Sequence, residues 1–262
     1  MNNQPILHVQ EVTKAFGGVI AVNGVSLDVN EGEILGIIGP NGSGKTTLIN
    51  CVTGFIKMTS GKIFFRGKNI TGKPAHKIAD MGITRTFQIM RPYYSLPCYK
   101  NLVIPLFSPR AKRTGGWRGG GKLGDRDTVS IDILEEIGFE RDSFVPYKLA
   151  STLPTGYLKR LELARCLALK PEIIICDEIF SGLSMSEIAS MVPLIERLQM
   201  DGITLIMIEH RLRELFRVSN RILVLNFGEK VIEGTPEEIM ADEKVKEVYF
   251  GSEEVEEVMS HA

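Results

Sequence analysis

The chain has few cysteines, no long apolar run and almost no net charge. Its four cysteines, Cys51, Cys98, Cys166 and Cys176, are scattered without a CxxC pair, which excludes a disulfide framework and a cysteine zinc site. The longest apolar runs have the length of a strand, far below the roughly 20 residues of a membrane-spanning helix. A net charge of −1 gives the chain as a whole no electrostatic footprint for nucleic acid.

Targeting and repeat signals are also missing from the sequence. The segment 1–5 has no basic stretch followed by an apolar one, so no secretory signal peptide is expected. The scattered cysteines are typical of a protein in a reducing cytosol. The 262 residues are enough for one large α/β domain. Because no internal repeat is visible, any site is expected once in each chain.

One strong motif is present, a glycine-rich loop between a predicted buried strand (33–38) and a predicted helix (45–52). The loop fits the pattern G-x-x-x-x-G-K-[ST]. Its residues are Gly39, Pro40, Asn41, Gly42, Ser43, Gly44, Lys45 and Thr46. Glycines let the backbone amides turn inward toward phosphates, and the helix N-terminus and Lys45 add positive charge. The hydroxyl of Thr46 suits Mg²⁺. The motif therefore predicts a nucleoside triphosphate site.

The remaining pattern predicts alternating strands and helices. Strands are expected over 6–12, 20–29, 61–66, 82–87, 172–176, 204–208 and 221–226. Helices are expected over 130–138 and 157–169. Capping boxes predict a helix that follows Ser184 and ends near Met200, and another that follows Thr235. The acidic tail 252–262 is expected to fray.

Two adjacent carboxylates, Asp177 and Glu178, follow the predicted apolar strand 172–176. An aspartate at such a strand end reaches the Mg²⁺ of a phosphate-loop protein, so Asp177 is the candidate metal ligand. Glu178 is then placed to polarise the attacking water as a general base. The structural alternative is that the pair only caps a loop or helix. Their position at the end of an apolar strand favours the catalytic interpretation.

Two further polar residues, Gln88 and His210, follow predicted strands in the same way. A lone histidine is more often a structural residue, but the position of His210 after the strand 204–208 favours contact with a γ-phosphate. Gln88 follows the strand 82–87 and is a candidate for contact with the metal or the attacking water. Both residues are therefore candidates for a catalytic role.

A basic, glycine-rich segment covers residues 109–124. It carries five positive charges, no negative charge and the single tryptophan, Trp117. One interpretation is a surface for nucleic acid or lipid headgroups, with Trp117 as an aromatic anchor. The interpretation that we favour is a mobile surface loop, because ordering a run of glycines is costly in entropy.

The order of these motifs resembles that of ABC-transporter ATPases over essentially the whole chain. Besides the loop, Gln88, Asp177, Glu178 and His210, the resemblance includes three further segments: an aromatic residue at Phe16, a signature region over 153–157 and a D-loop over 181–184. The segments 14–19, 85–88 and 228–238 are similar to those of the ATP-binding subunits of branched-chain amino-acid importers.

The resemblance implies a fold and a domain division. The fold is α/β, with a P-loop NTPase (RecA-like) core, an antiparallel β subdomain and an inserted α-helical subdomain. The whole chain, 1–262, would be a single ABC ATPase domain. Its core would lie at about 1–87 and 166–235, its helical signature subdomain at about 88–165 and its C-terminal helical tail at about 236–262.

The resemblance also implies an ATP and Mg²⁺ site with assigned residues. The residues implied to bind ATP are Phe16, Val22, the loop residues Gly39 to Thr46, Thr47, Thr155 and Gly156. Those implied to hold the metal are Thr46, Gln88 and Asp177. The implied catalytic residues are Glu178, His210 and Gln88.

The implied function is that of an ATP-hydrolysing subunit of an importer for a polar solute, branched-chain amino acids in particular. Two ATPase subunits, identical or different, would pair head-to-tail around two ATP molecules. They would act on integral-membrane permease subunits, with an extracytoplasmic solute-binding protein as an indirect partner and no nucleic acid. The chain would be peripheral on the cytoplasmic side of the inner membrane and soluble when isolated.

The sequence departs from the family pattern in its signature and its D-loop. The family signature is Leu-Ser-Gly-Gly-Gln, whereas this chain has Leu153, Pro154, Thr155, Gly156 and Tyr157. The D-loop has Ser184 in place of aspartate, and Ile179 stands in place of proline. These departures leave open a weakly active regulatory subunit of a heterodimer. A soluble ABC protein that acts on ribosomes or nucleic acid is another alternative, supported only by the basic segment.

Overall fold

The computed structural model describes residues 4–114, 124–243 and 245, and it divides into two compact units. The first unit contains Met1–Ile78 and Ile195–Ala262, and the second contains Ala79–Leu194. The boundaries fall within α2 (Ala75–Met81) and α7 (Met185–Met200). Among the described residues, no helix combines the length and the apolar character that crossing a membrane requires.

The N-terminal part of the chain forms an antiparallel sheet in the first unit. Its strands, in spatial order, are β2 (Val19–Val29), β1 (Leu7–Phe16), β4 (Ser60–Phe65) and β5 (Lys68–Asn69). Buried and exposed residues alternate over much of β1 and β2, because one face of each strand packs on the core and the other meets solvent. These strands confirm the predicted antiparallel β part of the fold.

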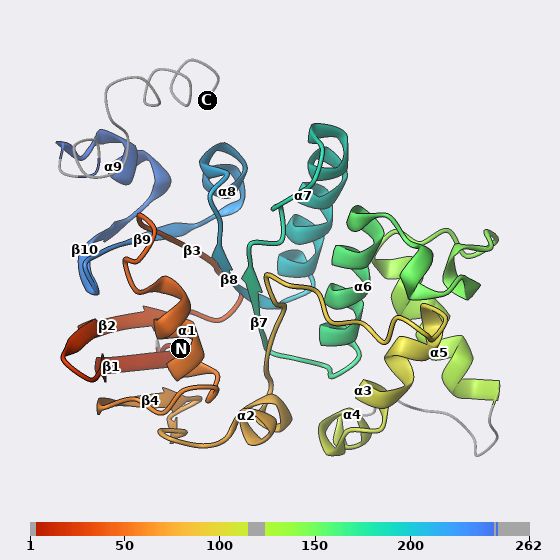
Figure 1. Cartoon of the computed structure of the whole chain (residues 1–262), viewed down its shortest axis with the longest axis horizontal. Coiled ribbons are helices and arrows are strands. Elements are labelled where there is room, and N and C mark those ends of the chain that lie inside the picture. Colours follow the sequence, from red (N-terminus) through yellow and green to blue (C-terminus); the bar gives the residue numbers. More distant parts are fainter. Residues whose placement is uncertain (1–3, 115–123, 244, 246–262) are drawn as a thin grey trace. The chain divides into compact units, whose positions relative to one another are not determined.

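Parallel strands form the centre of the first unit. The strand β3 (Ile34–Ile38) pairs in parallel with both β8 (Thr204–Ile208) and β9 (Arg221–Asn226), and β10 (Glu229–Gly234) pairs antiparallel with β9. All five residues of β3 and of β8 are buried, as expected for strands covered on both faces. Among the described residues, the helices that lie wholly within this unit are α1 (Lys45–Val52), α8 (Leu212–Val218) and α9 (Pro236–Ala241) (Figure 1).

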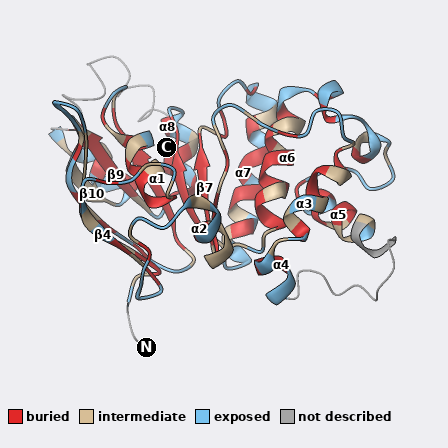
Figure 2. Cartoon of the chain, turned by 60° about the horizontal axis from the view of Figure 1, so that its bottom comes forward, coloured by how far each residue is buried: buried red, intermediate tan, exposed pale blue. Residues whose placement is uncertain are grey.

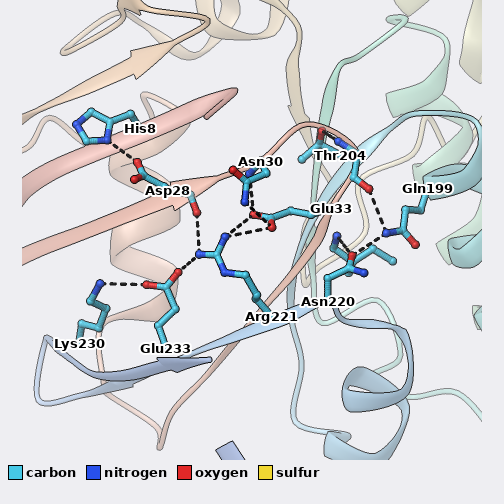
Figure 3. Close-up of polar contacts among 12 residues, drawn as sticks. His8, Asp28, Asn30, Glu33, Gln199, Thr204, Asn220, Arg221, Lys230 and Glu233 are labelled. Atoms are coloured by element: carbon cyan, nitrogen blue, oxygen red, sulfur yellow. Dashed lines mark hydrogen bonds and ion pairs between the residues drawn. The ribbon is translucent and has the colours of Figure 1, made fainter. Parts of the chain in front are cut away.

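A polar network fixes the amino ends of these parallel strands (Figure 3). Arg221, at the start of β9, donates two hydrogen bonds of 3.1 Å to the carboxylate of Glu33, which precedes β3. Arg221 also bonds to the carbonyl of Asp28 and to the carboxylate of Glu233. Thr204 Oγ1 accepts a 2.9 Å bond from the amide of Gly32. The strand that leads into the glycine-rich loop is thus anchored at its opposite end.

The second unit combines a short parallel strand pair with helices. The strand β6 (Ile83–Arg85) pairs with β7 (Ile173–Asp177). The helices wholly within this unit are α3 (Val103–Leu106), α4 (Pro109–Arg113), α5 (Gly124–Glu136) and α6 (Thr155–Leu167), with single 3₁₀ turns at Tyr99–Leu102, Val145–Tyr147 and Ala150–Thr152. Buried residues run along β7 and most of α6 (Figure 2).

Most predicted elements are present, with two corrections. The bounds predicted for α1, β8 and β9 agree with the structure, and both capping boxes are formed. The helix predicted to begin at Ser130 begins instead at Gly124. The prediction missed its first turns because they are polar and carry no apolar periodicity. The loop predicted from residue 109 is wrong for Pro109–Arg113, which is helix α4. Residues 115–123 and the tail 252–262 lie outside the described residues.

Candidate nucleotide site

The glycine-rich loop in the first unit connects β3 to α1. Lys45 folds back over the loop, and its ammonium donates to the carbonyls of Gly39 at 2.6 Å and Pro40 at 3.0 Å. Gly44 has a φ of 100°, and a Cβ there would lie 2.5 Å from the carbonyl oxygen of Ala21. Only glycine fits that position, which explains why the motif needs it. The loop therefore has the backbone curvature that a phosphate cradle requires.

The N-terminus of α1 is left open for an anion. Its N-cap residue, Gly44, provides no side-chain acceptor for the first amides, and its first turn contains no acidic residue. Asn41, Gly42 and Thr46 are exposed, and Thr47 is half-buried. Uncapped amides together with the partial positive charge of a helix N-terminus fit a phosphate group.

A turn from a distant part of the sequence supports this loop. Gly228, between β9 and β10, donates its amide to the carbonyl of Ser43 and accepts a bond from the amide of Asn23. The side chain of Asn23 donates to Glu229 at 2.7 Å. No local sequence signal marks this support, because the turn is far from the loop along the chain.

The other candidate residues of the first unit differ in exposure. Phe16 at the end of β1 is 48% exposed, with the ammonium of Lys14 4.6 Å from its ring centre. It is accessible for stacking. Val22 is fully buried in the core, so its predicted contribution to a nucleotide site stays a prediction. His210 is exposed and follows β8, whose Ile208 pairs with Ile37 of β3. His210 and the loop therefore leave the carboxyl ends of neighbouring parallel strands.

The second unit brings three predicted residues to one edge of a strand pair. Strand β6 ends at Arg85, three residues before Gln88, and is shorter than the predicted 82–87. Asp177 is the last residue of β7, which pairs in parallel with β6, and Glu178 follows it. The amide of Gln88 donates to the carboxylate of Glu178 at 2.9 Å. Glu178 has a φ of 52°, which is uncommon for a residue with a side chain. Local strain of this kind clusters at functional sites.

Sequence reasoning assigned no role to Arg85, which forms a buried ion pair with Asp177. The guanidinium lies 2.7 Å from the carboxylate, and the two side chains are only 6% and 4% exposed. Burial raises the pKa of Asp177 and lowers the pKa of Arg85, while the charge of each partner opposes the shift of the other. The Thr86 hydroxyl accepts the amide of Asp177 at 3.1 Å. Asp177 is therefore held rigidly.

The predicted signature residues lie at the start of α6. The N-cap, Pro154, offers no side-chain bond; Thr155 is exposed and Gly156 is buried. The carboxylate of Glu187 accepts bonds from the amide and hydroxyl of Ser184, and it also faces the amide of Gly156. These interactions lower the pKa of Glu187, with the Ser184 amide contributing most. The signature helix and the start of α7 are thus joined through one carboxylate.

A magnesium ion would depend on oxygen ligands that are not all carboxylates. Among the described residues, no group of three or more His, Cys, Asp or Glu could hold a metal ion. Mg²⁺ in nucleotide sites is commonly bound by one or two carboxylates together with phosphate oxygens. Of the predicted metal ligands, Asp177 has a carboxylate and Gln88 an amide oxygen in the second unit, and Thr46 has a hydroxyl in the first unit.

The described charges of the basic segment are engaged within the protein. Arg110 is 8% exposed and donates to the carbonyls of Lys170 and Met81 and to the carboxylate of Glu172. Arg113 forms an ion pair with Asp80 at 3.0 Å. Arg110 therefore packs in the second unit and is not part of an open basic surface. Trp117 lies outside the described residues.

The fold and loop define a P-loop nucleotide-binding protein of the α/β class. The family model described as "ABC transporter" matches residues 22–181, and that of "Branched-chain amino acid ATP-binding cassette transporter" matches residues 229–255. The chain belongs to the ABC transporter family. Its predicted fold class is thereby confirmed, and it carries a nucleotide-binding ATPase domain.

Curated relatives and solved structures agree with this family. The chain is 38% identical, over 95% of its length and 99% of the relative, to a high-affinity branched-chain amino acid transport ATP-binding protein, LivG, of Salmonella typhimurium. It is 37% identical, with the same coverage, to the corresponding BraF of Pseudomonas aeruginosa. The crystal structure of the ADP conformation of MJ1267, an ATP-binding cassette of an ABC transporter, superposes with a TM-score of 0.81 at 32% identity. The superposed region covers 94% of this chain and 98% of the MJ1267 chain.

Proposed function

We propose that this chain binds and hydrolyses ATP as the energy-coupling subunit of an importer for branched-chain amino acids. The phosphate loop carries the proposal, because Lys45 and the uncapped N-terminus of α1 form a site for polyphosphate and the first turn of α1 contains no acidic residue. The substrate class rests on the relatives, which are named for branched-chain amino acid transport and align over nearly the whole chain.

The residues divide the chemistry between binding and catalysis. Gly39 to Thr47 would bind the phosphates, Phe16 would stack on the adenine and Val22 would pack beside it. Thr46, Asp177 and Gln88 would hold Mg²⁺, which supplies charge neutralisation to the phosphates. Glu178 would accept a proton from the attacking water. Gln88 would orient the carboxylate of Glu178 through the 2.9 Å bond between them. His210 would donate a hydrogen bond to the γ-phosphate.

The assembly follows from the charge that must be neutralised around the γ-phosphate. We infer that two ATPase subunits pair head-to-tail, so that Thr155 and Gly156 of one chain complete the ATP site of the other. The single ABC ATPase domain would comprise a core at 1–87 and 166–235, a helical subdomain at 88–165 and a tail at 236–262. It would act on permease subunits from the cytoplasmic side of the inner membrane, with a solute-binding protein as an indirect partner.

The hydrolysis assignment is tested by Glu178→Gln in the full-length chain. Loss of a general base typically lowers the rate by about 10²–10⁴-fold, so kcat for ATP should fall at least about 100-fold. Nucleotide affinity should stay within about twofold, and the variant should form an ATP-dependent dimer in light scattering. Glu136→Gln, an exposed carboxylate on α5, serves as the matched control and should keep the parent rate. Hydrolysis by Glu178→Gln at the parent rate would show that the base is wrongly assigned.

The substrate class is tested in cells by uptake of radiolabelled leucine, isoleucine and valine. Lys45→Ala removes the cation of the phosphate loop and should abolish uptake of all three while leaving uptake of an acidic amino acid unchanged. Unchanged uptake of the three would contradict the substrate assignment without affecting the ATPase assignment. ATPase assays of the isolated chain, alone and mixed with a second ATPase subunit, distinguish a homodimer from a regulatory subunit of a heterodimer.

A further inference from the structure

Helix α6 carries two buried charged side chains whose partners are backbone atoms of other segments. Lys159 is 3% exposed and Glu162 is 4% exposed, although charged residues are rarely buried so completely unless they are bonded. They are three residues apart, so they lie on the same side of the helix. That side also contains Thr155, at the N-terminus of α6, one turn before Lys159.

Lys159 bonds to the segment that carries the proposed general base. Its ammonium donates to the carbonyl of Glu178 at 2.8 Å. The same carbonyl accepts the amide of Ser181 at 3.2 Å. Because Glu178 has a positive φ, the orientation of this peptide group and of its side chain depends on the contacts that hold it. The bond from Lys159 has a charged donor, and such hydrogen bonds are about twice as strong as those between neutral groups.

Glu162 bonds to the segment that carries Gln88. Its carboxylate accepts the amide of Arg91 at 2.9 Å and the amide of Phe87 at 3.4 Å, one on each side of Gln88. Arg165, also on α6, donates to the carbonyl of Arg91 at 2.8 Å. The backbone on both sides of Gln88 is therefore held from α6.

We infer that Lys159 and Glu162 are positioning residues, which set the contact between Gln88 and Glu178 from the signature helix. The side chains of Gln88 and Glu178 meet at 2.9 Å, while their backbones are held separately by Glu162 and Lys159. A displacement of α6 at its N-terminal end must therefore move both catalytic segments together. This inference rests on the proposed function, because it assigns to α6 the link between the signature residues and the proposed water-activating pair.

Two isosteric variants of the full-length chain test the inference, Lys159→Met and Glu162→Gln. Each should lower kcat for ATP by about tenfold or more, because small misplacements of catalytic groups cost about that much. The dissociation constant for ATP, measured by nucleotide binding without turnover, should change less than about twofold. Lys159→Arg, which keeps a cationic donor, should recover a large part of kcat. The double variant should lose no more than about threefold beyond the worse single variant, because both act on one unit.

The matched control is Arg110→Met. Arg110 is likewise buried in the second unit, and it donates to the carbonyls of Lys170 at 2.7 Å and Met81 at 2.8 Å and to the carboxylate of Glu172. These three partners lie outside the segments 87–91 and 178–181. This variant should lower the midpoint of urea unfolding about as much as Lys159→Met while leaving kcat within about twofold of the parent. If kcat of Lys159→Met or Glu162→Gln stays within twofold of the parent, or falls only as much as in Arg110→Met, the inference is overturned.

Hydrogen exchange separates failure of this inference from failure of the proposed function. Lys159→Met should speed amide exchange in peptides covering 87–91, although Lys159 does not bond to that segment, whereas Arg110→Met should not. This readout does not depend on hydrolysis. A parent chain that fails to hydrolyse ATP contradicts the proposed function, and unchanged exchange at 87–91 in Lys159→Met contradicts the coupling through α6.

Discussion

The ion pair between Arg85 and Asp177 gives a prediction whose size follows from burial. The two side chains are 6% and 4% exposed and 2.7 Å apart. Arg85→Met removes the counter-charge and leaves the Asp177 carboxylate buried. Breaking such a pair from one side typically costs about 3–5 kcal/mol. We expect the free energy of unfolding to fall by about 3 kcal/mol, at the lower end of this range.

Urea unfolding followed by circular dichroism, in buffer without magnesium or nucleotide, measures this loss. The exposed pair between Arg66 and Glu31, whose side chains are 45% and 62% exposed, provides the control. Arg66→Met should cost less than about 1 kcal/mol. The double variant Arg85→Met/Asp177→Asn should recover about 2 kcal/mol of the loss, because no unpaired charge then remains in the interior.

Two outcomes would refute this reasoning. One is a loss of less than about 1 kcal/mol for Arg85→Met, which would mean that Asp177 finds water or another donor when Arg85 is absent. The other is additivity of the two substitutions, which would mean that the pair contributes nothing beyond its members. Asp177 would then not be held by Arg85, and its rigid placement would need another explanation.

Three further predictions follow from named contacts. Arg221→Met should lower the free energy of unfolding by about 3 kcal/mol in urea titrations, because Glu33, at 9% side-chain exposure, loses its cationic partner (Figure 3). Asn101→Leu should cost about 2–3 kcal/mol in the same assay, because the fully buried Asn101 accepts the amide of Tyr93 and donates to the carbonyls of Leu96 and Pro97. Burial raises the pKa of Glu162 above its ordinary value, so its contribution to stability is present below the unfolded pKa and is lost as pH rises through the folded pKa. As pH rises above about 4.5, the free energy of unfolding of the parent should therefore fall relative to that of Glu162→Gln in urea titrations. A difference between the two free energies that stays constant with pH would contradict this.

The departures in the signature region have a structural counterpart. The family's serine is replaced by Pro154, which has no hydroxyl, and the helix begins without a side-chain cap. The amide of Gly156 instead faces the carboxylate of Glu187. The segment forms the start of α6, with Thr155 as its first helical residue.

The sequence by itself determined the elements whose signal is local. The phosphate loop, the strands β3, β8 and β9, and the capping boxes at Ser184 and Thr235 each depend on residues within a few positions of one another. The sequence did not predict the first turns of α5 or helix α4, because these segments are polar and lack apolar periodicity. Helix α4 is stabilised by contacts of Arg110, which bonds to residues far along the chain.

Only the tertiary structure decided which distant side chains meet. The motifs named Gln88, Asp177 and Glu178 as candidates, but the parallel pairing of β6 with β7 brings them to one edge. The roles of Arg85, Lys159 and Glu162 could not be assigned from the sequence, because they come from burial against atoms that are 19 to 92 positions away. Sequence periodicity records which face of an element is apolar; it does not record which buried charge on that face finds a partner, and that pairing depends on the packing of the whole unit.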